Sequence, residues 1–266
     1  MNFNKVKKLM TLMIILIFLV TTSSCVKTNI NQELQNKIND SNIMQSNVLI
    51  VKEVYNTNNQ SVSSISYTYG FSGGIIKRNN DRYYILTSYH PIEGIIDENL
   101  FILLWDEPRY NDLKSEEKKG VSTYYESKPT ARIEYVNIKY DLAIISFQSD
   151  VVLPVLEINS LPPKFNENIA TISNPKDRDR NYISFGKITS KSPVPFGDEK
   201  DDIQFGVIEH DAFISGGSSG SILINEDLKV VGINLGGTTN IFGKFIKGKA
   251  MPSNRIIDFI NEASIW

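Results

Sequence analysis

The stretch Ile208-Glu-His-Asp-Ala-Phe-Ile-Ser-Gly-Gly-Ser-Ser-Gly-Ser-Ile222 places a serine among glycines in the arrangement that acyl transfer requires. Ser219 is the candidate nucleophile. Gly217 has no Cβ, so the backbone can turn sharply there and bring the N–H groups of Gly217 and Ser219 toward one point. Two such N–H groups would form an oxyanion hole, which stabilises the charge that develops on an attacked carbonyl. Flexible loops use the same residues, so the assignment depends on a base and an orienting acid elsewhere in the chain.

The chain has two histidines, which limits the choice of a general base. His90 ends the run Tyr83-Tyr-Ile-Leu-Thr-Ser-Tyr-His90, whose β-branched and aromatic residues predict a strand that delivers its last residue to a loop. His210 lies shortly before Ser219 on the strand expected to lead to it, which predicts separation along the backbone and a structural or surface role. His90 is therefore the candidate base.

The candidate orienting acid is Asp141, which opens the apolar run Tyr140-Asp-Leu-Ala-Ile-Ile-Ser-Phe147. A carboxylate at the start of a buried strand can accept the second N–H of a catalytic histidine, although an aspartate there can also serve a turn alone. The order His90, Asp141, Ser219 is that of the chymotrypsin-type hydrolases, and this order favours a catalytic triad.

Two other hydrolase classes fit less well. Gly216-Gly-Ser-Ser-Gly220 matches the nucleophile elbow of α/β-hydrolases with Ser218 as nucleophile, but that fold needs a histidine downstream, and none follows position 210. Asp81 before His90 would supply the subtilisin order. The residues around Ser219 show no helical run that could carry the subtilisin fold.

From Val48 onward, short β-branched and aromatic runs alternate with Gly, Pro, Asn and Asp, which predicts an all-β barrel or sandwich. About 220 residues suit a single all-β domain, since such domains run to roughly 200 to 250 residues. At the end of the chain, the segment Arg255–Glu262 carries Ile256, Ile257 and Ile260 at helical spacing. We expect a C-terminal helix that docks on the second half of the domain.

Several further motifs follow in order along the chain: Gly70-Phe-Ser-Gly-Gly-Ile-Ile76, Leu86-Thr-Ser-Tyr-His90, Asp141-Leu-Ala-Ile144, Ile169-Ala-Thr-Ile-Ser-Asn-Pro175, Phe185-Gly-Lys-Ile-Thr-Ser190, Val231-Gly-Ile-Asn234 and Met251-Pro-Ser-Asn254. Together with the serine loop, they resemble the trypsin-like serine proteases of bacteria, in particular the Deg/HtrA-type protease domain and the related glutamyl endopeptidases. The resemblance extends from about Tyr67 to Ile260. Trp266 ends the chain soon afterwards, so a PDZ domain is not expected.

The resemblance implies a double six-stranded β-barrel with a C-terminal helix, and a serine endopeptidase that acts on polypeptides through His90, Asp141 and Ser219. It also implies that Asn234, Leu235 and Gly236 form a wall of the primary specificity pocket. Glutamyl endopeptidases have a histidine at the position that matches Asn234, so glutamate specificity is not implied. We expect a preference for a neutral side chain.

The N-terminus has the pattern of an export signal. Lys5, Lys7 and Lys8 precede the apolar run Leu9–Val20, and Thr21-Thr-Ser-Ser-Cys25 supplies small residues before the only cysteine. The pattern predicts a signal peptide over residues 1–24, a lipidated Cys25 that anchors the protein to the outer face of the bacterial membrane, and a polar tether over residues 25–47. A secreted form without lipid is the alternative. Ile30, Leu34 and Ile38 allow a short helix within the tether.

The protease domain is expected over residues 48–266. Twenty-eight basic and thirty acidic residues give no field that would attract nucleic acid. No residues have the spacing of a metal site or of a phosphate-binding loop, and no cofactor is expected. The rival hypothesis is a catalytically inactive surface lipoprotein that uses the same fold to bind proteins.

Overall fold

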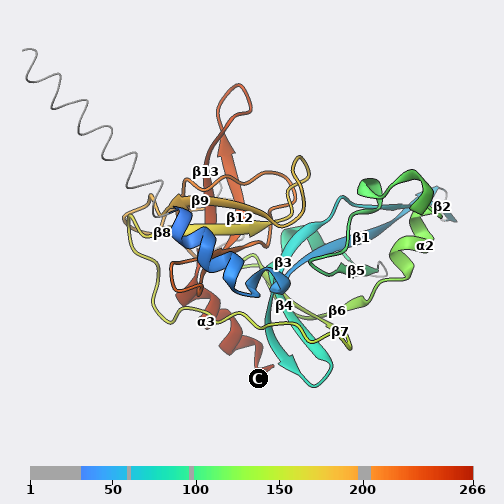
Figure 1. Ribbon diagram of the computed structural model, residues 1–266, viewed down its shortest axis with the longest axis horizontal. Coiled ribbons are helices and arrows are strands. Elements are labelled where there is room, and N and C mark those ends of the chain that lie inside the picture. Colours follow the sequence, from blue (N-terminus) through green and yellow to red (C-terminus); the bar gives the residue numbers. More distant parts are fainter. Residues whose placement is uncertain (1–30, 59–60, 96–98, 197–204, 266) are drawn as a thin grey trace, which may run out of the picture. The chain divides into compact units, whose positions relative to one another are not determined.

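The computed structural model describes residues 31–58, 61–95, 99–196 and 205–265 (Figure 1). The chain divides into two units, Met1–Asp40 and Ser41–Trp266, which are described separately. In the first, residues 31–40 form a helix, as the spacing of Leu34 and Ile38 allowed. The predicted signal peptide and Cys25 lie outside the described residues. Among the helices of the described part, none is long and apolar enough to cross a membrane.

The second unit begins at Ser41, ahead of the predicted boundary at 48, with a 3-10 turn η1 (Ile43–Ser46) that leads into the first strand. Its first sheet contains β1 (Asn47–Asn58), β2 (Ser61–Tyr67), β3 (Phe71–Asn79), β4 (Arg82–Ser88), β5 (Leu100–Leu103), β6 (Thr130–Asn137) and β7 (Leu142–Gln148). The strands are antiparallel in the order β2-β1-β3-β4-β7-β6-β5, and β1 also pairs with β5. This second pairing closes six strands into a barrel and leaves β2 as an extension of β1.

The first barrel is filled by β-branched and aromatic side chains from all of its walls. Ile50, Ile75, Ile85 and Ile145 have no exposed surface, and the ring of Tyr83 stacks on that of Phe147 with centroids 5.6 Å apart. Burial of each large apolar side chain stabilises the fold by about 1.5–3 kcal/mol. The barrel therefore gives the ends of β4 and β7 fixed positions.

The segment between β5 and β6 holds short helices that the sequence did not predict: η3 (Tyr110–Asp112), η4 (Ser115–Glu117) and α2 (Val121–Glu126). Tyr125 of α2 is buried and lies against Tyr67, with ring centroids 4.8 Å apart. Phe101 of β5 completes this aromatic cluster, which holds the segment against the barrel.

The second sheet contains β8 (Asn168–Ser173), β9 (Tyr182–Lys187), β10 (Ile208–His210), β11 (Ile222–Ile224), β12 (Val230–Thr239) and β13 (Phe245–Pro252). Its antiparallel order is β10-β13-β12-β11-β8-β9. A single bridge between Ile188 and His210 joins the two end strands. The predicted all-β fold with two six-stranded barrels is confirmed, although the second barrel is closed only by this bridge.

The C-terminal helix α3 (Ser253–Ala263) is confirmed, but its buried face differs from the prediction. Ile256 and Phe259 are the fully buried members, while Ile257 and Ile260 stay partly exposed. Phe259 packs against Tyr135 and Tyr140. These tyrosines belong to the first half of the domain, so the helix contacts both barrels and not the second alone.

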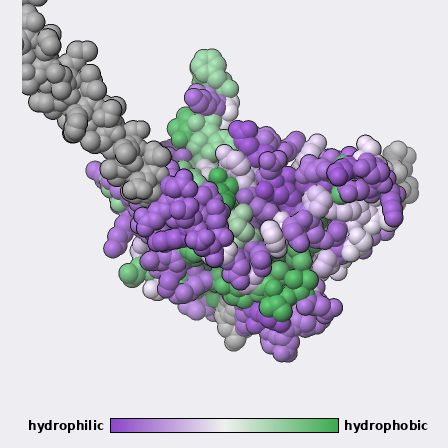
Figure 2. All heavy atoms as spheres, in the orientation of Figure 1, coloured by the Kyte–Doolittle hydropathy of each residue, from purple (hydrophilic) through white to green (hydrophobic). Residues whose placement is uncertain are grey.

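The hairpin between β12 and β13 projects from the second barrel (Figure 1) and ends in apolar residues that appear in green in Figure 2. Ile241 and Phe242 at its tip are 93% and 86% exposed. The side chain of Asn240 accepts the N–H groups of Phe242 and Lys244 at 2.9 and 3.0 Å. The turn is therefore well defined although its apolar side chains face outward.

Candidate active site

His90 lies where β4 ends and begins the short 3-10 turn η2 (His90–Ile92). Its Nδ1 is 2.7 Å from Oδ2 of Asp141, and its backbone N–H donates to Oδ1 of the same carboxylate at 2.8 Å. The histidine side chain is 43% exposed, whereas that of Asp141 is 5% exposed. The carboxylate thus fixes both the main chain and the ring of His90, and it leaves Nε2 accessible.

Asp141 stands in the turn between β6 and β7 with φ of +51°, in the left-handed region that Asn, Asp and Gly tolerate best. Its carbonyl oxygen accepts the N–H of Tyr89 at 2.9 Å. The turn brings the backbone of residue 141 alongside the end of β4, because β4 and β7 are paired strands. The local backbone therefore aims the carboxylate at His90.

Ser219 completes the line of hydrogen bonds, since its Oγ is 2.9 Å from Nε2 of His90. The serine comes from the second half of the domain. Its carbonyl oxygen accepts the N–H of Ser72 of β3 at 2.9 Å, so the two barrels are joined at this residue. The structure brings together the three residues predicted to act as base, acid and nucleophile.

The two glycines that flank Ser219 adopt conformations open to few other residues. Gly217 and Gly220 have φ of +97° and +78°. A Cβ at Gly217 would lie 2.6 Å from the carbonyl oxygen of Asn174, and one at Gly220 would lie 2.1 Å from Oγ1 of Thr87. The loop therefore requires glycine at both positions for steric reasons as well as for its turn.

The backbone N–H groups of Gly217 and Ser219 have no hydrogen-bond acceptor among the described residues. The carbonyl oxygen of Gly216 instead accepts the N–H of Lys176 at 2.7 Å. Because a trans peptide is planar with its C=O and N–H opposed, this bond directs the N–H of Gly217 away from Lys176. Unpaired N–H groups beside a nucleophile are what an oxyanion hole provides.

Ser218, the nucleophile of the alternative α/β-hydrolase hypothesis, is 1% exposed. Its Oγ accepts the N–H of Ser215 at 3.2 Å and stabilises the turn. The double-barrel fold also differs from the folds of the α/β-hydrolases and the subtilisins. Both alternative hydrolase classes are therefore wrong.

His210 is completely buried at the end of β10. Its Nε2 is 2.7 Å from Oδ1 of Asn234, whose Nδ2 donates to Oγ of Ser221 at 2.8 Å. Burial lowers the pKa of His210 to about 4, which keeps the ring neutral at physiological pH. The structural role predicted for this histidine agrees with these contacts.

The predicted substrate-contacting residues Asn234, Leu235 and Gly236 lie on β12. Asn234 and Leu235 are 0% and 2% exposed, and Gly236 is partly exposed. The side chains of Asn234 and Leu235 thus belong to the interior. On the neighbouring strand β13, Lys247 pairs with Glu209, and Lys249 donates to the carbonyl of Pro195.

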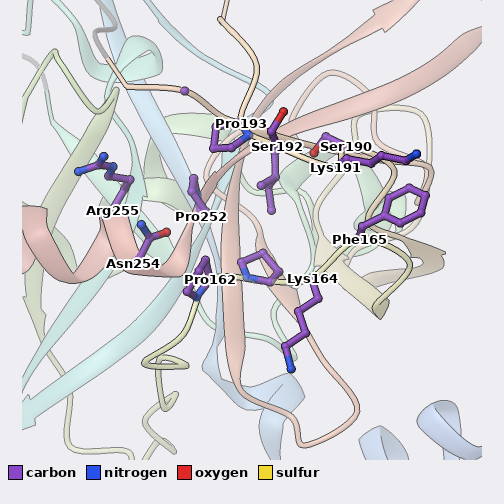
Figure 3. A pocket seen from close by; sticks show the side chains of 13 residues that line it. Pro162, Lys164, Phe165, Ser190, Lys191, Ser192, Pro193, Pro252, Asn254 and Arg255 are labelled. Carbon is purple, nitrogen blue, oxygen red and sulfur yellow. The ribbon is translucent and has the colours of Figure 1, made fainter.

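A cavity of about 460 Å³ lies beside the start of α3, and the residues that line it include none of the triad. Pro162, Pro193 and Pro252 contribute to its walls (Figure 3). The charged ends of its basic residues Lys164, Lys191 and Arg255 extend away from its centre in this view. Arg255 pairs with Asp258 at 3.0 Å, so the cavity does not gather these charges on a common point.

The sequence did not single out the side chains that support the serine loop. Ser72 donates through Oγ to the carbonyl of Gly217 at 2.9 Å and accepts the N–H of Asn174 at 2.8 Å. Arg109, from the segment after β5, donates to the carbonyls of Asn174 and Pro175. Ser72 lay within a recognised glycine-rich motif, but nothing in the sequence around Arg109 indicated its place.

The family profile described as "Trypsin-like peptidase domain" matches residues 70–233, which is more than half of the chain. The protein therefore belongs to the trypsin-like peptidase family, and its two barrels form the chymotrypsin-like double barrel.

Among characterised proteins, the chain is similar to the serine protease Do-like HtrA of Bacillus subtilis (strain 168), with 29% identity over 166 residues, covering 61% of this chain and 32% of that protein. It is 25% identical over 194 residues to the serine protease Do-like HtrB of the same organism, covering 72% of this chain and 38% of that protein. It is also 27% identical over 146 residues to the probable periplasmic serine endoprotease DegP-like of Rickettsia conorii (strain ATCC VR-613 / Malish 7), covering 54% of this chain and 28% of that protein. The chain thus spans about a third of the length of these relatives.

Proposed function

We propose that the protein is a serine endopeptidase that hydrolyses peptide bonds of exported polypeptides through an acyl-enzyme intermediate. The observation that carries this proposal is the unbroken line of hydrogen bonds from Asp141 through His90 to Ser219, at 2.7 and 2.9 Å. Residues in contact at these distances can transfer a proton without rearrangement. Membership of the trypsin-like family and similarity to proteins named serine proteases support the same reaction.

In the proposed first step, Oγ of Ser219 attacks the scissile carbonyl carbon while Nε2 of His90 takes the hydroxyl proton. The C–O bond forms, and the carbonyl oxygen becomes an oxyanion held by the N–H groups of Gly217 and Ser219. The buried carboxylate of Asp141 accepts the N–H at Nδ1 and stabilises the imidazolium. Its contacts to both the ring and the main chain of His90 keep the base in one orientation.

In the following steps, His90 gives its proton to the leaving amine as the C–N bond breaks, and the acyl group stays on Ser219. A water molecule then attacks the ester and loses a proton to His90, and the acid product leaves as Ser219 regains its hydrogen. Because His90 is 43% exposed, water can reach Nε2 for this second half.

For substrate preference we propose a neutral side chain before the scissile bond, paired with the backbone of residues 234–236. Gly237 follows these residues on β12, and its nearest apolar neighbour is Ile214. A Cβ at the glycine would lie 3.4 Å from Cδ1 of Ile214. Lys247 is neutralised by Glu209 and Lys249 is directed to a carbonyl, so neither supplies a cation for an acidic substrate.

The catalytic test uses residues 26–266 as wild type, Ser219→Ala and Ser218→Ala. A fluorophosphonate probe should label the wild type and Ser218→Ala at Ser219, as located by mass spectrometry, and both should cleave casein. Ser219→Ala should do neither. A folded wild type that is neither labelled nor active would favour the rival hypothesis of a protein-binding module.

We further propose that residues 1–24 are an export signal and that a lipid on Cys25 anchors the protein to the outer face of the membrane. The apolar run followed by small residues and the lone cysteine supports this, and one of the relatives is named as periplasmic. In the expressed full chain, an alkyne fatty acid should label the wild type but not Cys25→Ser, which should appear in the medium. An unlabelled wild type in the medium would favour the secreted alternative.

A further inference from the structure

The buried side chain of Arg109 joins the first barrel to a segment of the second. Arg109 is 6% exposed. Its Nη2 donates to the carbonyls of Asn174 and Pro175 at 2.9 and 2.8 Å, and its Nη1 lies 3.4 Å from the carbonyl oxygen of Arg178. The carboxylate of Asp112, half exposed at the rim, lies 3.5 Å from Nη1. The planar guanidinium thus holds the two consecutive carbonyls of Asn174 and Pro175 in one geometry.

The same segment holds the peptide between Gly216 and Gly217. The N–H of Lys176 donates to the carbonyl of Gly216 at 2.7 Å. A Cβ on Gly217 would lie 2.6 Å from the carbonyl oxygen of Asn174 and 3.2 Å from the backbone N of Lys176. Residues 174–176 therefore pack closely against this peptide, and the bond from Lys176 sets where the N–H of Gly217 points.

The segment has few other means of holding its carbonyls. Pro175 has no N–H, and the N–H of Asn174 is used by Oγ of Ser72. Among the described residues, no backbone N–H donates to the carbonyls of Asn174 or Pro175. Removing Arg109 would therefore leave two carbonyls without their donor, and the segment would then be held mainly through the side chain of Asn174, which donates to the carbonyl of Val48 and accepts the N–H of Asn181.

We infer that Arg109 is a positioning residue for the oxyanion hole: its guanidinium fixes residues 174–176, which in turn fix the Gly216–Gly217 peptide with the Gly217 N–H directed into the site. The inference rests on the proposed peptidase function. It predicts that loss of Arg109 weakens stabilisation of the oxyanion more than binding of the substrate. Loss of one oxyanion donor lowers kcat on the order of 100- to 1000-fold, and a misdirected donor should cost part of that.

The kinetic test compares Arg109→Gln and Arg109→Lys with Arg82→Gln. Arg82 serves as the control because it pairs with Glu134 at 3.4 Å within the first barrel, and none of its contacts among the described residues involves residues 174–176. We expect Arg109→Gln to lower kcat about 10- to 100-fold with KM changed less than about threefold, Arg109→Lys to regain part of the loss, and Arg82→Gln to retain kcat. A peptide boronate, which places an oxygen anion in the hole, should lose affinity in parallel with kcat.

A second readout does not require activity. In protein labelled with ¹³C′,¹⁵N-glycine, an HNCO spectrum contains only glycines that follow a glycine, namely Gly74, Gly217 and Gly237. The Gly217 signal should move in Arg109→Gln but not in Arg82→Gln, with Gly74 and Gly237 as internal references. An inactive wild type would overturn the proposed function while this spectrum still tests the positioning. An unmoved Gly217 signal, or equal loss of kcat in both arginine variants, would overturn the inference.

Discussion

The two histidines of the chain occupy opposite environments. The side chain of His90 is 43% exposed. Its Nδ1 contacts the carboxylate of Asp141, and its Nε2 contacts the hydroxyl of Ser219. His210 is fully buried, and its Nε2 meets an uncharged amide. A Cβ on Gly248 would lie 2.2 Å from Cε1 of His210, so the ring packs directly on that glycine.

Access and a charged partner, rather than residue type, decide which of the two histidines can act as a base. A general base must take up a proton during the reaction, and a buried ring without a carboxylate resists the resulting charge. His210 in contrast stabilises the neutral interior of the second barrel. Variants at the two positions should therefore separate loss of activity from loss of stability.

The largest effect is expected for His90→Ala. Without the imidazole, Ser219 has no base, and kcat should fall on the order of a millionfold, as it does when a triad member is removed. Because His90 is partly exposed, the free energy of unfolding in urea should change little. Cleavage of a chromogenic peptide under single-turnover conditions measures the fall in the rate of the chemical step. Substantial residual turnover in His90→Ala would show that another group acts as the base.

Asp141→Asn comes next. An amide at this position keeps the size of the side chain but removes its charge and favours the wrong tautomer of His90, which should lower kcat on the order of 10⁴-fold. The backbone N–H of His90 can still donate to the amide oxygen. Thermal unfolding should show whether the fold is kept. A kcat within tenfold of the wild type would show that Asp141 serves the turn alone.

Local patterns were sufficient to select three residues that the fold brings into hydrogen-bonding contact, whereas the support of these residues depends on contacts between distant segments. His90, Asp141 and Ser219 each stand at the end or start of an apolar run, and their order along the chain indicated the class of site. No such pattern surrounds Arg109, because its role depends on hydrogen bonds to the carbonyls of residues 174 and 175. Only folding brings these carbonyls close to Arg109.

The same limit applies to the fold. Alternation of apolar runs and turns predicted an all-β domain with a terminal helix. The helix buries Phe259 rather than Ile257 or Ile260, because Tyr135 and Tyr140 of the first barrel lie on its other side. Periodicity could not show which face these tyrosines would cover.

Substitution of His210 should affect stability more than catalysis. His210→Leu leaves the amide oxygen of Asn234 buried without a donor, which should destabilise the protein by about 1–3 kcal/mol. His210→Gln retains a donor and should recover part of that loss. Urea unfolding at neutral pH measures both, and kcat should stay within about tenfold. A large fall in kcat with unchanged stability would place His210 in the reaction and remove the contrast with His90.

His210 should also make the stability of the protein depend on pH. Burial lowers its pKa in the folded protein to about 4, below the value of about 6.5 expected in the unfolded chain. Between these two values the unfolded chain binds more protons, so stability falls as pH falls. The contribution is fully present above about pH 6.5 and is lost progressively toward pH 4.

Comparison with His210→Gln isolates this contribution, because glutamine occupies the site without titrating. The free energy of unfolding should decrease more steeply for the wild type than for the variant when urea unfolding is repeated at pH 7, 6, 5 and 4.5. Carboxylates titrate in both proteins and therefore cancel in the difference, provided that their surroundings are unchanged. Parallel curves would mean that the ring can be protonated in the folded state at little cost, and the environments of the two histidines would then differ in access alone.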